Sequence, residues 1–246
     1  MSVENAVYND LLSNIVNGRI RPGERMTLAG LAEQYNARPA VIRKSVRKLQ
    51  KQGLVESRRK WGTYVKEHSV DEWLDYFRLR EALETVAARR AAEVVTAEQS
   101  DILFELADKF YEAAKAQMSA RSRKEQVRLE QQVLLTDRHF HRTIVRFSGS
   151  VLVARVHAEH DIHPISSIVD GRPIADAQFD RDGLSALLEK SHQEHRALCE
   201  AIKGRNADEA EQIMRQHIRF ALGLLQQWKL RQIKQEDTSL EQHKQT

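Results

Sequence analysis

The sequence predicts a mainly α-helical protein in which a small N-terminal winged helix-turn-helix domain precedes an all-helical antiparallel bundle. The 246 residues include only 4 Pro and 10 Gly among many residues of high helix propensity, and apolar residues recur at helical spacing. Residues 1–68 hold 13 Lys and Arg against 6 Asp and Glu, a net charge of +7, whereas the remainder is slightly acidic. A basic head of this kind is expected where only the head contacts a polyanion such as nucleic acid.

The composition also indicates the compartment. The single cysteine, Cys199, cannot form an internal disulfide, and no apolar leader follows a basic start. No segment approaches the ~18 consecutive apolar residues of a membrane span. We therefore expect a cytoplasmic protein that does not contact membranes.

Three helices are predicted in the basic head. The first covers about residues 4–17, where apolar residues recur at helical spacing. The second is short, starts after the N-cap residue Thr27 and ends at Asn36, which tolerates a left-handed backbone. The third runs from Pro39 to about Gln52, because proline lacks only an N–H that the first helical position does not use.

The third helix and the hairpin that follows it are both basic. Residues 54–56 and 63–65 are expected to form short strands joined by a tip that contains a glycine. In a winged helix-turn-helix of this kind a helix enters the major groove and the wing neutralises phosphates. The alternative is a winged-helix module that contacts protein. The expected DNA-binding residues are Arg38, Arg43, Lys44, Arg47, Arg58, Arg59, Lys60 and Gly62.

Capping-box patterns divide the rest of the chain into helices. They pair Ser69 with Glu72, Thr96 with Gln99, Ser122 with Glu125 and Asn206 with Glu209. Helices are expected near residues 70–94, 96–118, 123–147, 150–160, 182–203 and 207–230. A loop or broken helix is expected over 161–181. The predicted domains are a DNA-binding head over 1–68, a helical domain over 69–235 and a polar tail over 236–246.

One aspartate and three histidines lie on the apolar stripes of these helices: Asp137, His141, His195 and His217. The turn at 204–206 makes the last two helices an antiparallel hairpin, which brings His195 and His217 to within about 3 Å of the same level. Burial of an unpaired carboxylate is costly, and a divalent cation would satisfy all four groups together. Taken singly, each histidine could instead be a hydrogen-bonded core residue.

The other histidines of the helical domain are given less direct roles. His139 and His192 lie nearer the edges of the stripes, and His157, His160 and His163 adjoin the irregular segment. We expect these five side chains to be surface or pocket-rim groups. They become alternative ligands if the helical register differs.

Two charged residues, Arg80 and Glu84, interrupt the apolar stripe of the helix over 70–94. One interpretation is an internal ion pair between residues four positions apart. The other is that Arg80 reaches a pocket beside the metal and binds a carboxylate bidentately. We favour the second interpretation, which makes both residues effector-binding.

The head contains five short motifs of one known family: Ile20–Met26, Leu31-Ala32, Val46–Leu49, Gly53–Val55 and Gly62–Val65. Through them it resembles the GntR superfamily of bacterial transcription regulators. The resemblance implies that Arg43 is the second recognition-helix arginine, which reads bases. The family usually has a Ser-Arg pair where this chain has Arg38-Pro39, so a changed operator sequence is expected, with Arg38 as a possible substitute.

The helical domain has similar family motifs at Asp137–His141, Glu194–Leu198 and Met214–His217. These segments resemble the FCD domain, the effector domain of the FadR-type branch of the same superfamily, over about residues 70–230. The resemblance implies a divalent ion, often zinc, nickel or manganese, held by the Asp and three His named above. It also implies a homodimer, and the family's Arg-x-x-x-Glu pattern agrees with Arg80 and Glu84.

These features predict a ligand-responsive transcription regulator, preferably a repressor, that binds double-stranded operator DNA and a small organic or sugar acid. The acid would alter helix packing and so the spacing of two heads in a dimer. Activation and a purely structural metal are alternatives. A metal-dependent hydrolase is a third, but no inward general base beyond Glu84 or Glu130 is evident, so we expect no enzyme.

Overall fold

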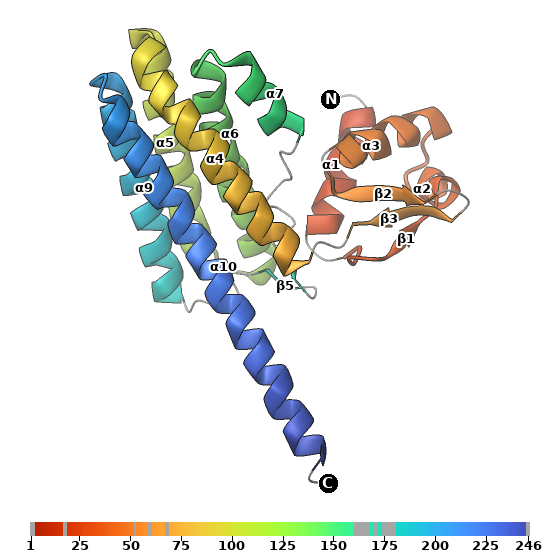
Figure 1. Ribbon diagram of the computed structural model, residues 1–246. Coiled ribbons are helices and arrows are strands. Elements are labelled where there is room, and N and C mark those ends of the chain that lie inside the picture. The colour runs from red at the N-terminus through yellow and green to blue at the C-terminus, as the bar shows by residue number, and fades with distance from the viewer. Residues whose placement is uncertain are drawn as a thin grey trace. The chain divides into compact units, whose positions relative to one another are not determined.

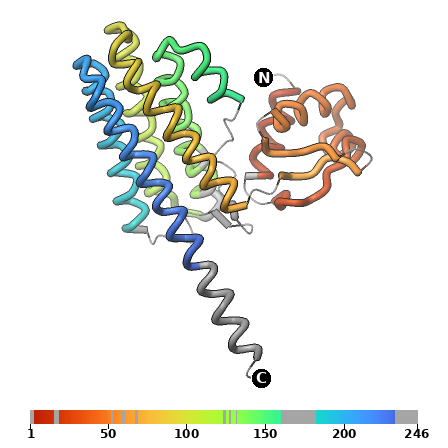
Figure 2. The backbone as a smooth tube through the Cα atoms, viewed as in Figure 1, coloured from red at the N-terminus to blue at the C-terminus, as the bar shows by residue number. Residues whose placement is uncertain are grey.

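The fold of the protein is described from a computed structural model (Figure 1). Figure 2 traces the same backbone and marks the remaining residues in grey. The structure describes residues 3–16, 19–51, 53–58, 61–66, 69–159, 168–169, 172–173 and 181–244. The chain forms two compact units, of which the first contains residues 1–68 with 113–135 and 161–173, and the second contains the rest. The expected domain boundaries stay a prediction.

The N-terminal part of the first unit is a winged helix-turn-helix, as predicted. Its helices are α1 (Val3–Val16), α2 (Leu28–Gln34) and α3 (Pro39–Lys51). Its antiparallel sheet has the order β1-β3-β2 and consists of β1 (Arg25–Met26), β2 (Val55–Arg58) and β3 (Gly62–Val65). The sequence did not indicate β1, because a two-residue strand is defined only by its pairing with β3, where Arg25 lies opposite Tyr64.

Local signals in the head act where the sequence places them. The hydroxyl of Thr27 accepts a hydrogen bond from the Gly30 N–H at 3.0 Å, which caps α2. Asn36 has a φ of 43°, the left-handed conformation that ends this helix. The apolar sides of the three helices and the sheet share one core, formed by Val7, Leu11, Ile15, Met26, Leu31, Ile42, Val46, Leu49, Leu54, Val55 and Val65.

The rest of the described chain is almost entirely helical. Its helices are α4 (Val70–Val94), α5 (Ala97–Met118), α6 (Arg123–Phe147), α7 (Val151–Glu159), α9 (Arg181–Lys203) and α10 (Ala207–Lys244). Within the second unit α4 packs along α10 and also contacts α9 and α7 (Figure 1). In the segment expected to be a loop, two short strands pair, β4 (Ile168–Val169) and β5 (Arg172–Pro173), and the other residues of 161–180 lie outside the described residues.

The predicted capping boxes begin the helices of the bundle. At the start of α4, Ser69 accepts from the Glu72 N–H at 3.1 Å, and the Glu72 carboxylate accepts from the Ser69 N–H at 2.9 Å. The start of α5 has the same reciprocal pair. At α6 the Glu125 N–H bonds to Ser122, but the Glu125 carboxylate accepts instead from the Arg121 N–H at 2.9 Å. Capping residues therefore fix the helix starts independently of the core.

The last helix is longer than predicted. The sequence indicates an end near residue 230 and a polar tail from 236, whereas α10 continues to Lys244. The expected end is wrong because no glycine or proline follows Gly223, and the Lys, Gln, Glu and Leu that do follow it are good helix formers. Among the described residues, no helix is both long and apolar enough to cross a bilayer.

The helices of the second unit enclose a separate core rich in alanine and aliphatic residues. Cys199 lies within it at 1% exposure, and burial raises the pKa of its thiol to about 12. The core is formed by Ala88, Ala91, Ala92, Val95, Leu103, Leu106, Ala107, Phe140, Ile144, Leu198, Cys199, Ala201, Ile202, Ala210, Met214 and Ile218.

Candidate metal centre and DNA-binding surface

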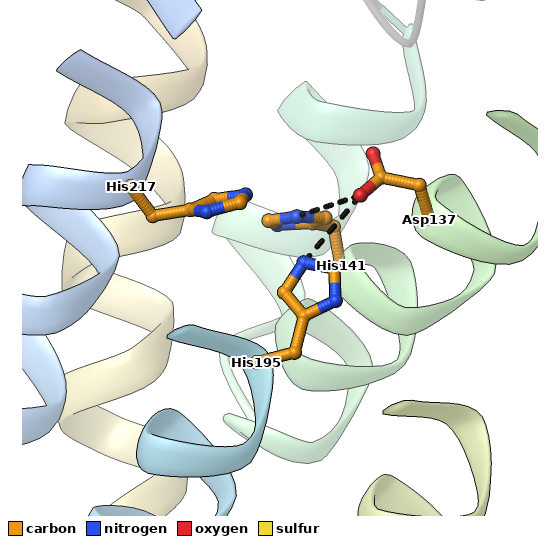
Figure 3. A group of neighbouring side chains, drawn as sticks. All are labelled: Asp137, His141, His195 and His217. Carbon is orange, nitrogen blue, oxygen red and sulfur yellow. Dashed lines mark ion pairs between the residues drawn. The ribbon is translucent and has the colours of Figure 1, made fainter. Parts of the chain in front are cut away.

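The four predicted ligands converge in the second unit, and one donor atom from each lies within 4.8 Å of the others. Figure 3 shows that Asp137 and His141 project from α6, His195 from α9 and His217 from α10 toward a common point. The centroids of the three imidazole rings are 4.9 to 5.3 Å apart. The side chains of His141 and His195 are 2% and 1% exposed, and that of Asp137 is 19% exposed.

Several ring nitrogens in this cluster are buried without a hydrogen-bond partner. They are Nε2 of His141 and both nitrogens of His195. The nearest carboxylate oxygen, Oδ1 of Asp137, is 3.7 Å from the first Nε2 and 3.4 Å from the second (Figure 3). A buried polar atom without a partner costs roughly 1–3 kcal/mol. Three imidazoles and a carboxylate with unused lone pairs fit a divalent cation, which would satisfy these atoms at once.

Two of the imidazoles are oriented by carboxylates on the side away from the cluster. Oε2 of Glu84 lies 2.7 Å from Nδ1 of His141, and Oε2 of Glu194 lies 2.8 Å from Nδ1 of His217. Each carboxylate can accept only from a protonated Nδ1, so each ring presents the lone pair of Nε2 to the cluster. This arrangement is typical of histidines that ligate metals.

Burial keeps the imidazoles neutral. It lowers the pKa of His195 well below the ordinary value, and the nearby His217 and His141 lower it further. Burial also lowers the pKa of His141, although the charge of Glu84 opposes the effect. Neutral imidazole is the form that binds a metal ion, so the protein holds these side chains ready for one.

Arg80 and Glu84 form a buried ion pair on α4. Nε of Arg80 lies 2.7 Å from Oε1 of Glu84, and Nη2 lies 3.4 Å from Oε2. Burial alone raises the pKa of Glu84, but the charges of Arg80 and His141 outweigh it and hold that pKa well below its usual range. The internal ion pair considered for these two residues therefore exists. Their effector-binding role stays a prediction.

His157 differs from its predicted surface or rim position. It is 6% exposed, and its Nε2 lies 3.2 Å from Oε1 of Glu84. The prediction is wrong because α7 packs against α4, and His157 follows Val153 by one helical turn on the packed side. His139 is exposed as expected, His192 stacks on Tyr111 at 4.0 Å, and His160 and His163 lie outside the described residues.

The sequence analysis overlooked Glu194 as a partner of the cluster. Its carboxylate bonds to His217 and to Nζ of Lys190, the residue one turn earlier on α9. The antiparallel hairpin predicted for α9 and α10 places His195 level with His217, so it also places the preceding glutamate beside His217. That level matching was the signal available in the sequence.

The predicted recognition helix presents free cations. Arg43 and Arg47 on α3 are exposed, and in the described part of the chain neither takes part in an ion pair. Lys44 lies 3.7 Å from Glu4. The opposite side of α3 is buried through Ile42, Ser45, Val46 and Leu49. One face of this helix is therefore packed, and the other is available to phosphates and base edges.

The remaining predicted DNA-binding residues lie before α3 and in the wing. Arg38 and Arg58 are exposed, and Arg58 bonds to Glu56 at 2.7 Å. Gly62 has a φ of 111°, and a Cβ there would lie 3.1 Å from Nε of Arg25, so glycine is favoured at this turn. Arg59 and Lys60 lie outside the described residues.

A winged helix-turn-helix joined to a helical domain with a histidine cluster is the organisation of a bacterial transcription regulator. The profile of bacterial regulatory proteins of the gntR family matches residues 4–65, and that of the FCD domain matches residues 75–220. The chain therefore belongs to the GntR family of transcription regulators and carries an FCD effector domain. These families are regulators, so the expectation of no enzyme is confirmed and the hydrolase alternative is set aside.

Similar proteins have the same architecture. The chain is 25% identical over 210 residues to the HTH-type transcriptional regulator YdhC of Bacillus subtilis, covering 85% of each chain. It is 26% identical over 216 residues to the HTH-type transcriptional repressor RspR of Escherichia coli, covering 88% of this chain and 86% of RspR. The solved structure of E. coli McbR/YncC superposes with a TM-score of 0.64 at 19% identity, covering 92% of this chain and 98% of that one.

Proposed function

We propose that this regulator is a ligand-responsive repressor that binds operator DNA as a homodimer and holds a divalent metal ion with Asp137, His141, His195 and His217. The observation that carries the metal assignment is the convergence of four donors from three helices, with buried ring nitrogens that have no other partner. The repressor role is supported by similarity to RspR, which is named a repressor. The domain division at residue 68 is part of the proposal.

The donor set suits zinc, nickel or manganese. Imidazole is a common ligand of zinc and nickel, and the carboxylate also accommodates manganese. An ion with four protein ligands supplies open coordination positions when it prefers a higher coordination number, and these can bind an oxygen of a small acid. Asp137, the most exposed of the four ligands, sets the side from which such an acid approaches.

Arg80 and Glu84 are assigned to effector binding. The guanidinium of Arg80 has five N–H groups, and its two bonds to Glu84 fix it along one edge. The carboxylate of a small organic or sugar acid would bind the other edge bidentately. Glu84 thus contributes by orienting both Arg80 and His141. An acid bound between the metal and α4 would alter the packing of α4 against α10.

The proposal is tested by elemental analysis of the purified protein together with mass spectrometry of any small acid that copurifies. We expect about one zinc, nickel or manganese ion per chain, and release of a selected operator duplex when the identified acid is added. Protein without a divalent metal would refute the metal assignment. A metal whose removal by chelator lowers thermal stability but leaves acid binding intact would identify the site as purely structural.

A further inference from the structure

We propose that Trp61, at the tip of the wing, lies in the minor groove beside the recognition helix and favours A·T base pairs there. The inference rests on operator binding by the winged domain. Trp61 is 69% exposed, whereas the other two tryptophans of the chain, Trp73 and Trp228, are 2% and 5% exposed. A large apolar side chain at the tip of a hairpin gains free energy only when a partner covers it.

The backbone around Trp61 is held on both sides. Its N–H donates to the carbonyl of Arg58 at 2.9 Å, and its own carbonyl accepts from the hydroxyl of Tyr64 at 3.1 Å. The guanidinium of Arg58 lies over the Tyr64 ring, 4.6 Å from its centroid. A side chain presented by a fixed turn loses little further freedom on binding, which favours affinity.

The charge around this tip favours nucleic acid as the partner. The residues that precede Trp61 are Arg58, Arg59 and Lys60, so the indole follows three consecutive cations in the sequence. These cations would neutralise phosphates on the walls of a groove while the indole contacts sugars and base edges between them. A protein partner would have to present a strongly acidic surface to the same hairpin.

The chemistry of indole favours one groove and one type of base pair. A helix fills the major groove, so the adjacent hairpin meets the neighbouring backbone and minor groove. The minor-groove edge of an A·T pair presents only acceptors, whereas a G·C pair adds the amino donor of guanine. Indole Nε1–H is a donor only. Trp61 can therefore hydrogen-bond to an A·T edge, and a G·C edge offers it a competing donor.

The test combines tryptophan emission with the anisotropy of labelled duplexes. Because Trp73 and Trp228 are buried, the long-wavelength emission of the full-length protein comes from Trp61. Fluorescein-labelled poly(dA-dT) and poly(dG-dC) duplexes serve as probes, and anisotropy reports binding without using tryptophan. We expect duplex binding to shift or quench the long-wavelength emission, and Trp61→Phe to lack this signal.

The two variants separate contact from base preference. Trp61→Ala should weaken binding to both duplexes about tenfold. Trp61→Phe keeps an aromatic ring but has no N–H, so it should retain most of the affinity and lose the preference of the wild-type protein for poly(dA-dT). Unchanged emission on duplexes that anisotropy shows to be bound, with wild-type affinity in both variants, would overturn the proposal. Wild-type protein that binds neither these duplexes nor a selected operator would overturn DNA binding itself.

Discussion

The carboxylate of Glu84 on α4 and the imidazole of His141 on α6 are joined by a 2.7 Å hydrogen bond at Nδ1 of the histidine. The bond fixes both the tautomer and the rotation of a ring whose other nitrogen faces the histidine cluster. The same carboxylate also binds Arg80 and His157. Residues on three helices are therefore held in register with one proposed metal ligand.

Glu84→Gln should weaken metal binding about 10- to 100-fold, because the amide no longer favours the protonated Nδ1 of His141 as strongly as the carboxylate does. The metal dissociation constant, measured by competition with a chromogenic chelator, checks this. Glu194→Gln is the matched variant for His217 and should act in the same direction. Wild-type metal affinity in both variants would mean that these carboxylates only stabilise the fold.

His217→Ala should empty the metal site and leave operator affinity without effector unchanged, because the winged domain contributes none of the ligands. Elemental analysis and the anisotropy of a selected operator duplex measure the two effects. His139→Ala, which removes an exposed histidine of α6, is the control and should retain its metal. Full metal content in the His217 variant would contradict the ligand assignment.

Removal of the metal should lower the melting temperature. A ligand that binds only the folded state at 100 times its dissociation constant contributes about 2.7 kcal/mol to stability. Thermal melts with and without a strong chelator measure the shift, which readdition of metal should reverse. The His217→Ala protein should melt at one temperature under both conditions, and an equal chelator effect in that variant would show that the ion binds elsewhere.

Arg43→Ala should cost about 1–3 kcal/mol at the selected operator and relax base preference, because this exposed guanidinium is available to base edges. Lys60→Ala should instead weaken binding to all duplexes comparably and reduce the salt dependence. Arg78→Ala, which removes an exposed cation from the helical bundle, is the control for net charge. Identical losses on operator and random duplex for both head variants would argue against base reading by α3.

Local signals in the sequence were sufficient for most of the fold and for the four clustered side chains. Thr27, Ser69 and Pro39 define helix starts through their own bonding properties, and helical periodicity places Asp137 and His141 on one side of α6. Features set by packing between elements were not accessible in the same way. The strand β1 exists only through β3, and the burial of His157 depends on the contact of α7 with α4.

Cys199 gives the protein a practical property. It is the single thiol of the chain, and its 1% exposure and raised pKa shield it from alkylating reagents. A cysteine introduced on the exposed side of α3 would therefore be the one position that a maleimide dye or nitroxide modifies. Spectroscopic rulers between two such labels in an assembled dimer would report directly how far apart the reading heads stand before and after a signal arrives.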